Sequence, residues 1–289
     1  MARRIPTPEQ KDAMVASYLA GMPQTEAAGQ FGFCHRTCGR ILQQRGIPRR
    51  SQCETSRRYT VDHAFFDVID SEEKAYWLGF LTADGNIGKN TLKLQIQRKD
   101  IQHLYKYKSS LCSMHPIYDV EGKRGESTWH CGRVEIHSTS LTTALRKLGV
   151  KENKSFTVRP CEGIPGGLLR HYWRGVLDGD GCITSYLRKN GSRAWSVSLI
   201  GNREMVSGFS NYLYEFIGKH ATVFPTKSVF TVFYGGGALP QKIVSVLYKD
   251  AMIFLDRKRQ RAQELMETSF HHTNIKYLTL QGNGYGYRR

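Results

Sequence analysis

Glu73–Gly85 has the sequence EKAYWLGFLTADG and Leu169–Gly181 has LRHYWRGVLDGDG, so one segment occurs twice, 96 residues apart. Each copy carries two small residues four positions apart, a spacing that puts both on one face of a helix. These are Gly79 and Ala83 in the first copy and Gly175 and Gly179 in the second. Small residues at this spacing let two helix backbones approach closely. The repeat therefore predicts two helices in direct contact in a pseudo-two-fold architecture.

An aspartate stands near the end of each copy, Asp84 before Gly85 and Asp180 before Gly181. Glycine suits the left-handed residue that follows many helices, so both acids are expected in a last helical turn. A carboxylate there faces the negative end of the helix dipole, and two such acids held together repel each other. Because a divalent cation would reverse both penalties, these are the candidate metal ligands. The alternative is that one aspartate caps a turn while the other is solvated.

The composition points to an acidic partner. The chain has 42 basic and 25 acidic residues, for a net charge of +17, and nucleic acid is the commonest partner of such a surplus. Hydrophobic residues make up 40% of the 289, which argues against global disorder. No apolar run is long enough for a membrane span, and Arg3 and Arg4 precede no signal-like stretch. The odd count of seven cysteines suits reduced thiols, so a cytoplasmic, nucleoid-associated protein that is not secreted is expected.

The two segments resemble the paired signature of LAGLIDADG homing endonucleases, in the single-chain form that carries two copies. The second copy is close to the pattern, whereas the first has Thr82 in place of the earlier acid but keeps Ala83-Asp84-Gly85. The ends of the family repeat are matched by Leu148–Ser155 and by Leu247–Tyr248 with Leu255–Lys258. The resemblance covers roughly residues 71–265.

The resemblance implies an α+β fold of two pseudo-symmetric αββαββα repeats, with two saddle-shaped sheets that lie on DNA. It implies Mg²⁺ (or Mn²⁺) held by Asp84 and Asp180, assisted by the backbone carbonyls of Ala83 and Gly179. The reaction would be hydrolysis of a phosphodiester in each strand of a long specific double-stranded target, leaving 3′ overhangs. The family also often adds a water-organising residue, for which Gln97 (or Arg98) serves by position.

The resemblance further implies a lysine near the start of the last helix. No lysine occurs at the corresponding positions of the two repeats, Ser138–Ser140 and Gly235–Gly237. The second repeat has Gly201-Asn202-Arg203 where the first has Gln97, which weakens the parallel. The identity of the basic residue is therefore left open.

Polar residues alternate with apolar ones in the expected strands. In Thr91–Gln97 the apolar side chains are expected to face the helices and the polar ones to face outward. Asn190-Gly191 predicts a hairpin with a basic tip. A solvated polar face is the alternative to contact with DNA. The candidate DNA-binding residues of this region are Lys93, Gln95, Gln97, Arg133, His137, Arg188, Lys189, Arg193, Ser196 and Ser198.

The sequence pattern of residues 1–48 predicts a small helical module. Thr7-Pro8-Glu9-Gln10 has the composition of a capped helix start, and the spacing that follows resembles a helix-turn-helix of the resolvase or transposase type. Arg36, Thr37 and Arg40 of its third helix would face DNA. The alternative is a three-helix cap with a solvated basic face. Arg49 and Arg50 begin a basic stretch expected to track phosphates.

The expected domains are 1–48 helix-turn-helix, 49–70 basic linker, 71–157 first repeat, 158–168 inter-repeat linker, 169–269 second repeat and 270–289 flexible basic tail. A monomer is expected, because one chain holds both repeats. Zinc is not expected, since the Cys and His clusters lack the paired spacing of a zinc site.

The sequence favours a site-specific double-strand DNA endonuclease of a mobile intron or a free-standing element. A free-standing protein is expected because the chain begins at Met and shows no flanking protein-splicing blocks. The alternative within the same fold is a non-cleaving DNA-binding regulator or an intron RNA splicing factor. An unrelated α/β metalloenzyme that acts on a small acidic substrate fits the charge and the duplication poorly.

Overall fold

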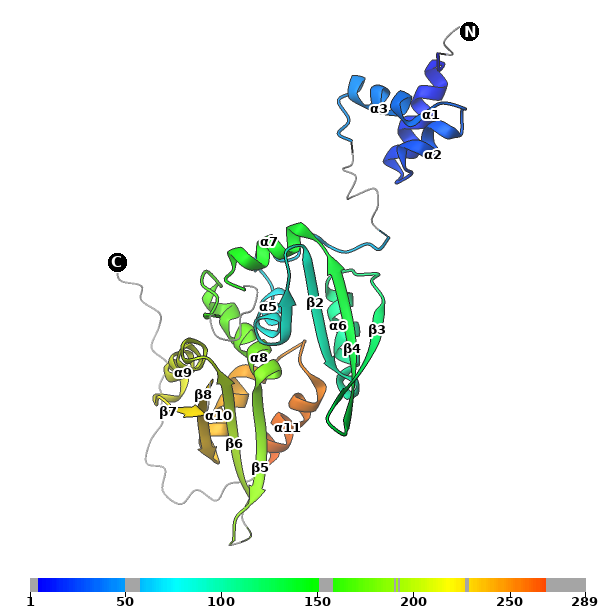
Figure 1. The fold of residues 1–289 in the computed structure, drawn as a ribbon. Helices are drawn as coiled ribbons and strands as arrows, with labels where there is room; N and C mark the ends of the chain where they lie inside the picture. The colour runs from blue at the N-terminus through cyan, green and yellow to red at the C-terminus, as the bar shows by residue number, and fades with distance from the viewer. Residues whose placement is uncertain are drawn as a thin grey trace, which may run out of the picture. The chain divides into compact units, whose positions relative to one another are not determined.

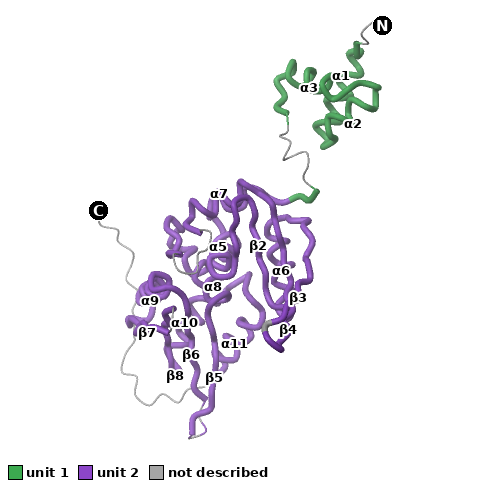
Figure 2. Tube along the Cα trace, in the orientation of Figure 1, with its two compact units in different colours: residues 1–60 green, residues 61–289 purple. Residues whose placement is uncertain are grey.

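The computed structural model describes residues 5–49, 58–150, 158–189, 191, 193–226 and 229–268. The chain divides into two compact units, residues 1–60 and residues 61–289 (Figure 2). The boundary falls inside the segment predicted as a linker. Phe65, Phe66 and Ile69 are buried in the core of the second unit. Residues 61–70 are therefore part of that unit, because their apolar side chains pack there, and the predicted linker of 49–70 extends too far.

The first unit contains three described helices, α1 (Pro8–Leu19), α2 (Gln24–Gly29) and α3 (His35–Gln44). The predicted capping box is present, because Thr7 and Gln10 each accept a hydrogen bond from the other's backbone N–H. Ala28 is fully buried where the helices meet, and Gly32 has the positive φ of a tight turn. The predicted helices are thus confirmed, while their contact with DNA stays a prediction.

The second unit contains the same order of elements twice (Figure 1). The first half comprises α5 (Glu72–Asp84), β1 (Gly85–Ile87), β2 (Thr91–Gln97), the 3₁₀ turn η1 (Arg98–Asp100), α6 (Gln102–Ser110), β3 (Ile117–Arg124), β4 (Ser127–His137) and α7 (Thr139–Lys147). The second half comprises η3 (Gly166–Leu168), α8 (Leu169–Asp180), β5 (Gly181–Leu187), β6 (Arg193–Gly201), α9 (Arg203–Ile217), β7 (Val223–Thr226), β8 (Val229–Gly236) and α10 (Ala238–Tyr248), followed by α11 (Asp256–Glu267). The predicted αββαββα repeats are confirmed.

Each half forms one antiparallel sheet of four strands, in the order β1-β2-β4-β3 in the first and β5-β6-β8-β7 in the second. The alternation predicted for β2 is confirmed, because Leu92, Leu94 and Ile96 are buried under the helices. On β6 the inward positions are filled by Trp195 and Leu199, on either side of Val197. One face of each sheet is therefore the wall of the core.

The helices α5 and α8 pack against each other between the two sheets (Figure 1). The middle of each helix is buried, over residues 75–82 of α5 and residues 171–178 of α8. No helix in the described ranges is long and apolar enough to span a membrane.

Candidate active site

The contact between α5 and α8 is close enough to exclude any side chain at two positions. A Cβ built on Gly79 would lie 2.0 Å from the carbonyl oxygen of Tyr172, and one on Gly175 would lie 2.1 Å from that of Tyr76. Real Cβ atoms do not approach a backbone so closely, so the helices touch through their main chains. The direct helix contact predicted from the small residues is confirmed.

The two motif aspartates are the last residues of these helices. Asp84 ends α5 and Asp180 ends α8, and both side chains are exposed. A Cβ built on Gly179 would lie 2.3 Å from the Cβ of Ala83 and 3.4 Å from Oδ2 of Asp84. The lack of a side chain at Gly179 thus lets the end of α8 pack directly against Ala83, beside the Asp84 carboxylate. The C-terminal ends of both helices meet at this point.

The glycines that follow the aspartates differ from the expectation. Gly85 and Gly181 have φ of −69° and −92°, which is ordinary extended backbone rather than a left-handed cap. Each begins a strand directly after the helix. A Cβ at Gly85 would lie 2.6 Å from the Leu81 carbonyl oxygen, and one at Gly181 would lie 2.2 Å from Cδ1 of Leu177. Glycine is needed there because the chain turns too sharply from helix to strand for a side chain to fit.

Lys258, at the third position of α11, lies against the end of α8. Its side chain is buried, and Nζ donates to the carbonyl oxygens of Leu177 and Gly181, at 2.6 Å each. Burial lowers the pKa of Lys258 to about 8, although the carboxylates of Asp178 and Asp84 oppose that shift. A cationic side chain is therefore held beside the motif aspartates.

Lys258 stands near the start of the last described helix, where the resemblance leads one to expect a lysine, and it was not among the residues predicted for the site. In the sequence it is one member of the basic run Arg257–Arg259, in which Arg257 is exposed and Arg259 is half-buried. The sequence of α11 does contain a signal for an inward-facing lysine. Its buried residues, Lys258, Ala262 and Leu265, are spaced four and three positions apart and therefore lie on one face of the helix. A lysine on the apolar face of an otherwise charged helix marks an inward-facing cation.

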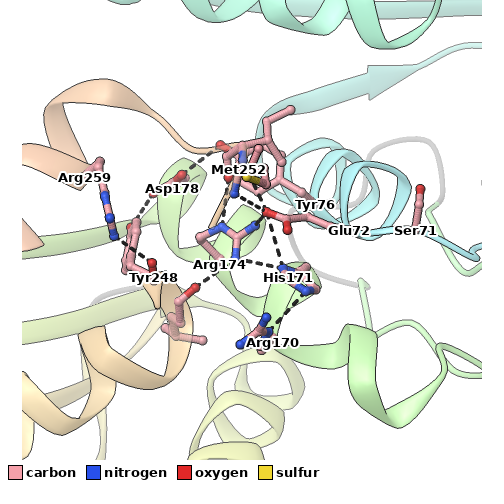
Figure 3. Close-up of polar contacts among 12 residues, drawn as sticks. Ser71, Glu72, Tyr76, Arg170, His171, Arg174, Asp178, Tyr248, Met252 and Arg259 are labelled. Atoms are coloured by element: carbon pink, nitrogen blue, oxygen red, sulfur yellow. Dashed lines mark hydrogen bonds and ion pairs between the residues drawn. The ribbon is translucent and has the colours of Figure 1, made fainter. Parts of the chain in front are cut away.

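Asp178, two residues before Asp180, is completely buried at the centre of a polar network (Figure 3). Its carboxylate accepts hydrogen bonds from the hydroxyls of Tyr76 (2.8 Å) and Tyr248 and from the backbone N–H of Leu255 (2.7 Å). Burial raises the pKa of Asp178, while these donors and Lys258 act against the rise. Because Leu255 is the N-cap residue of α11, Asp178 ties the start of that helix to α8.

Arg174, one turn earlier on α8, is also fully buried in this network (Figure 3). Its guanidinium donates to the carbonyls of Ile253 and Leu247 (both 2.9 Å) and to Oε1 of Glu72 (2.6 Å). The same oxygen of Glu72 accepts the backbone N–H of Met252 at 2.8 Å. Burial lowers the pKa of Arg174, and Glu72 opposes that shift. The network therefore fastens the segment between α10 and α11 to both central helices.

The predicted DNA-binding residues of the first sheet lie on the face that the helices do not cover. Lys93 and Arg133 are half-buried there, whereas Gln95 and His137 are exposed. Gln97, the predicted water-organising residue, is exposed at the end of β2, three residues beyond the Leu94 that pairs with Gly85.

In the second sheet, Arg188, Lys189 and Arg193 are exposed around the β5–β6 turn. Ser198 is half-buried, but Ser196 is buried and its hydroxyl lies 3.0 Å from that of Thr184. Ser196 is therefore a poor DNA contact, because its partner and its burial hold it within the sheet.

In the first unit, α3 carries all three predicted contacts: Arg36 and Arg40 are exposed and Thr37 is half-buried. Arg49 is exposed as well. Arg50 and the predicted tail of 270–289 lie outside the described residues. Within the described part of the chain, no group of three or more His, Cys, Asp or Glu side chains is arranged around a common point.

No protein-family model matches this sequence, and no curated protein matches it. Solved structures similar to the chain include the LAGLIDADG meganuclease I-SmaMI bound to uncleaveable DNA, with 15% identity and a TM-score of 0.48, covering 68% of this chain and 90% of that one. The LAGLIDADG meganuclease I-AabMI bound to uncleaved DNA has 12% identity and a TM-score of 0.46, covering 66% and 88%. Full-length DUF199/WhiA from Thermatoga maritima has 12% identity and a TM-score of 0.44, covering 73% and 67%.

Proposed function

We propose that this protein is a metal-dependent, site-specific double-strand DNA endonuclease. The observation that carries the proposal is the pair Asp84 and Asp180, exposed at the meeting ends of two helices whose backbones touch. Local rules disfavour an acid at the negative end of a helix, and here two occur where the ends of the two helices meet. One aspartate in each of two similar repeats suits a reaction that is carried out once on each strand of a DNA duplex.

The residues at this point fit a divalent cation. Mg²⁺ prefers carboxylate and carbonyl oxygens and is usually bound by one or two carboxylates together with substrate phosphates. Asp84 and Asp180 supply the carboxylates and the backbone carbonyls of Ala83 and Gly179 are at hand, because Gly179 lets the two helix ends pack closely. Mg²⁺ or Mn²⁺ bound there would polarise the phosphoryl group and lower the pKa of a bound water.

Lys258 contributes a fixed positive charge to the same place. Two of its three N–H donors are used on the carbonyls at the end of α8, which holds the ammonium in one position. A cation fixed in a partly desolvated site stabilises negative charge that develops on a phosphate in the transition state. The polar network around Asp178 and Arg174 in turn keeps the start of α11, and with it Lys258, in place.

We propose that DNA lies on the uncovered faces of the two sheets, and that α3 of the first unit, considered by itself, also contacts DNA. A net charge of +17 provides the attraction for phosphates. Because both repeats occur in one chain, we propose that a monomer engages both halves of a long target. Such a protein would act in the cytoplasm, on the nucleoid.

Cleavage selection on a randomised DNA pool with Mg²⁺ tests the proposal. We expect discrete double-strand cuts with 3′ overhangs, and a loss of about a thousandfold or more in Asp180→Asn with binding retained. Lys258→Met is expected to lose cleavage but not binding. Glu267→Gln, which changes an exposed acid of α11, is the matched control and should cleave normally.

Tight binding without cuts by the native protein would favour the regulator over the nuclease, and tight binding to structured RNA alone would favour the splicing factor. Absence of any nucleic-acid binding at low salt would overturn all three.

A further inference from the structure

The register of the two sheets fixes which of their residues correspond. Gly85 after the first motif pairs with Leu94, and Gly181 after the second pairs with Leu199. Leu94 pairs in turn with Val134, and Leu199 with Val232. These matched pairs make β6 the counterpart of β2 and β8 the counterpart of β4. Every position on the uncovered faces can therefore be compared between halves.

On the first sheet the compared positions carry charged and amide groups. Lys93 is ion-paired with Glu135 (3.3 Å), and Arg133 and His137 lie 3.8 and 3.6 Å from the same carboxylate. Gln95 is exposed among them. This face presents hydrogen-bond donors and acceptors.

On the second sheet none of the described counterparts is charged. Lys93 corresponds to Ser198 and Gln95 to Ile200, and across the ladder Glu135 corresponds to Phe233. The same register replaces Arg133 by Thr231 and His137 by Gly235. Ile200 and Phe233 are each 47% exposed, and Phe224, the counterpart of Tyr118, is 50% exposed.

Large apolar side chains gathered on one exposed face usually mark an interaction surface. Ile200 and Phe224 both flank Thr231 in the ladder, and Phe233 lies two residues further along β8, so the three share one face. The turn that ends the neighbouring hairpin carries exposed Arg188 and Arg193. The apolar patch is at one end of this sheet and the basic turn is at the other end of β6. This arrangement suits a polyanion with apolar groups in its groove, and it disfavours a second copy of this basic chain.

We propose that the two sheets read the two halves of the target by different chemistry, and that the second sheet recognises thymine C5-methyl groups in an A·T-rich half-site. In the major groove, thymine alone presents a methyl group, which Phe and other apolar side chains contact. Lys and Arg contact guanine and Gln contacts adenine there, so the first sheet reads a half-site of mixed composition. This inference rests on the proposed function and adds the substrate preference of one half.

Reciprocal exchanges between the sheets locate the two half-sites. DNA recovered by binding from a randomised duplex pool is sequenced for the native protein, for Ile200→Gln and for Gln95→Ile. All substituted side chains are exposed, so the fold tolerates them. We expect Ile200→Gln to change the base preference in one half only, and Gln95→Ile to change it in the other. The half that responds to Ile200→Gln is expected to be rich in thymine.

Replacing thymine by deoxyuridine in the selected duplex then removes the methyl group and nothing else. Binding is expected to weaken about fourfold for each contacted methyl, the value of one buried carbon. Deoxyuridine in the other half should have little effect. Phe233→Ser should bind the native and deoxyuridine duplexes with nearly equal affinity.

The protein could cleave or enrich a specific DNA that shows no thymine preference in the half that responds to Ile200→Gln, or no deoxyuridine effect in that half. Either result would overturn this inference and leave the proposed function intact. So would a concentration-dependent dimer in sedimentation that Phe233→Ser abolishes, since a second copy would then cover the face. No enrichment of any sequence would overturn both.

Discussion

The two central helices share a backbone geometry but differ in their buried chemistry. Gly79 on α5 and Gly175 on α8 meet the opposite helix at nearly equal distances. Yet α8 carries Arg174 and Asp178 where α5 has Leu78 and Thr82. The Thr82 hydroxyl donates to the Leu78 carbonyl of its own helix (2.7 Å) and lies 3.8 Å from Cys161 Sγ, whereas Asp178 accepts from three donors of other elements.

The difference shows that close helix contact and the anchoring of a neighbouring segment are separate tasks. Contact needs only small residues, so both helices meet that need in the same way. Anchoring needs polar groups. The fully buried ones, Arg174 and Asp178, lie on α8, while Glu72 at the start of α5 accepts from Met252 of the same segment.

The largest effect is expected where the helices are alike. Gly79→Ala and Gly175→Ala each place a Cβ about 2 Å from a backbone oxygen, so the helices must separate. We expect each to lower the free energy of unfolding by about 3 kcal/mol or more. Urea denaturation measures this, with Gly167→Ala as the control, since a Cβ there meets nothing within 4 Å. Markedly unequal losses would show that the contact is not symmetric.

A smaller effect is expected where the helices differ. Asp178→Asn keeps the shape but turns one acceptor into a donor that faces existing donors, and should cost about 2 kcal/mol. Thr82→Val at the matched position should cost about 1 kcal/mol or less. Cleavage assays should show a lower rate in Asp178→Asn and little change in Thr82→Val. Equal effects of both variants on stability and rate would contradict a special role for the α8 network.

The network also predicts a pH dependence. His103 is buried beside Tyr76, whose hydroxyl lies 2.9 Å from His103 Nε2, and burial lowers the pKa of His103 to about 3. Between pH 6.5 and 3 the unfolded chain binds a proton that the folded chain does not, so stability falls as the pH falls. The contribution of His103 is about 1.4 kcal/mol per pH unit in that window.

The difference between the native protein and His103→Gln isolates this contribution, because the other titrating groups, such as His171 and Asp178, are common to both. Unfolding free energies measured from pH 7 to pH 4 should converge as the pH falls. Parallel curves would mean that the pKa of His103 does not differ between the folded and the unfolded protein.

The smallest effect is expected at the β5–β6 turn. Arg188→Ala removes one exposed cation and should weaken DNA binding about threefold, with the slope of log K against log salt reduced by about 1. Fluorescence anisotropy at several salt concentrations measures both quantities. An unchanged slope would place Arg188 away from the phosphates.

Much of the fold could be predicted because its signals are local. The capping box at Thr7 and the alternation in Thr91–Gln97 each depend on residues that are neighbours in the chain. The conformation of Gly85 and Gly181 was mispredicted, since a glycine after a helix serves a left-handed cap and a sharp helix-to-strand turn equally well. Sequence alone does not distinguish the two.

The candidate site, like the fold, has features that the sequence predicts and features that only tertiary packing decides. The duplication, the small residues of the helix contact and the positions of Asp84 and Asp180 are all specified by the amino-acid sequence, because each is a pattern within one short segment. The inward turn of Lys258 and the partners of Arg174 and Asp178 depend on tertiary packing. The partners on α10 and at the start of α11 lie 70 or more residues away in the chain, and only the packing of these elements against α8 brings them to Arg174 and Asp178.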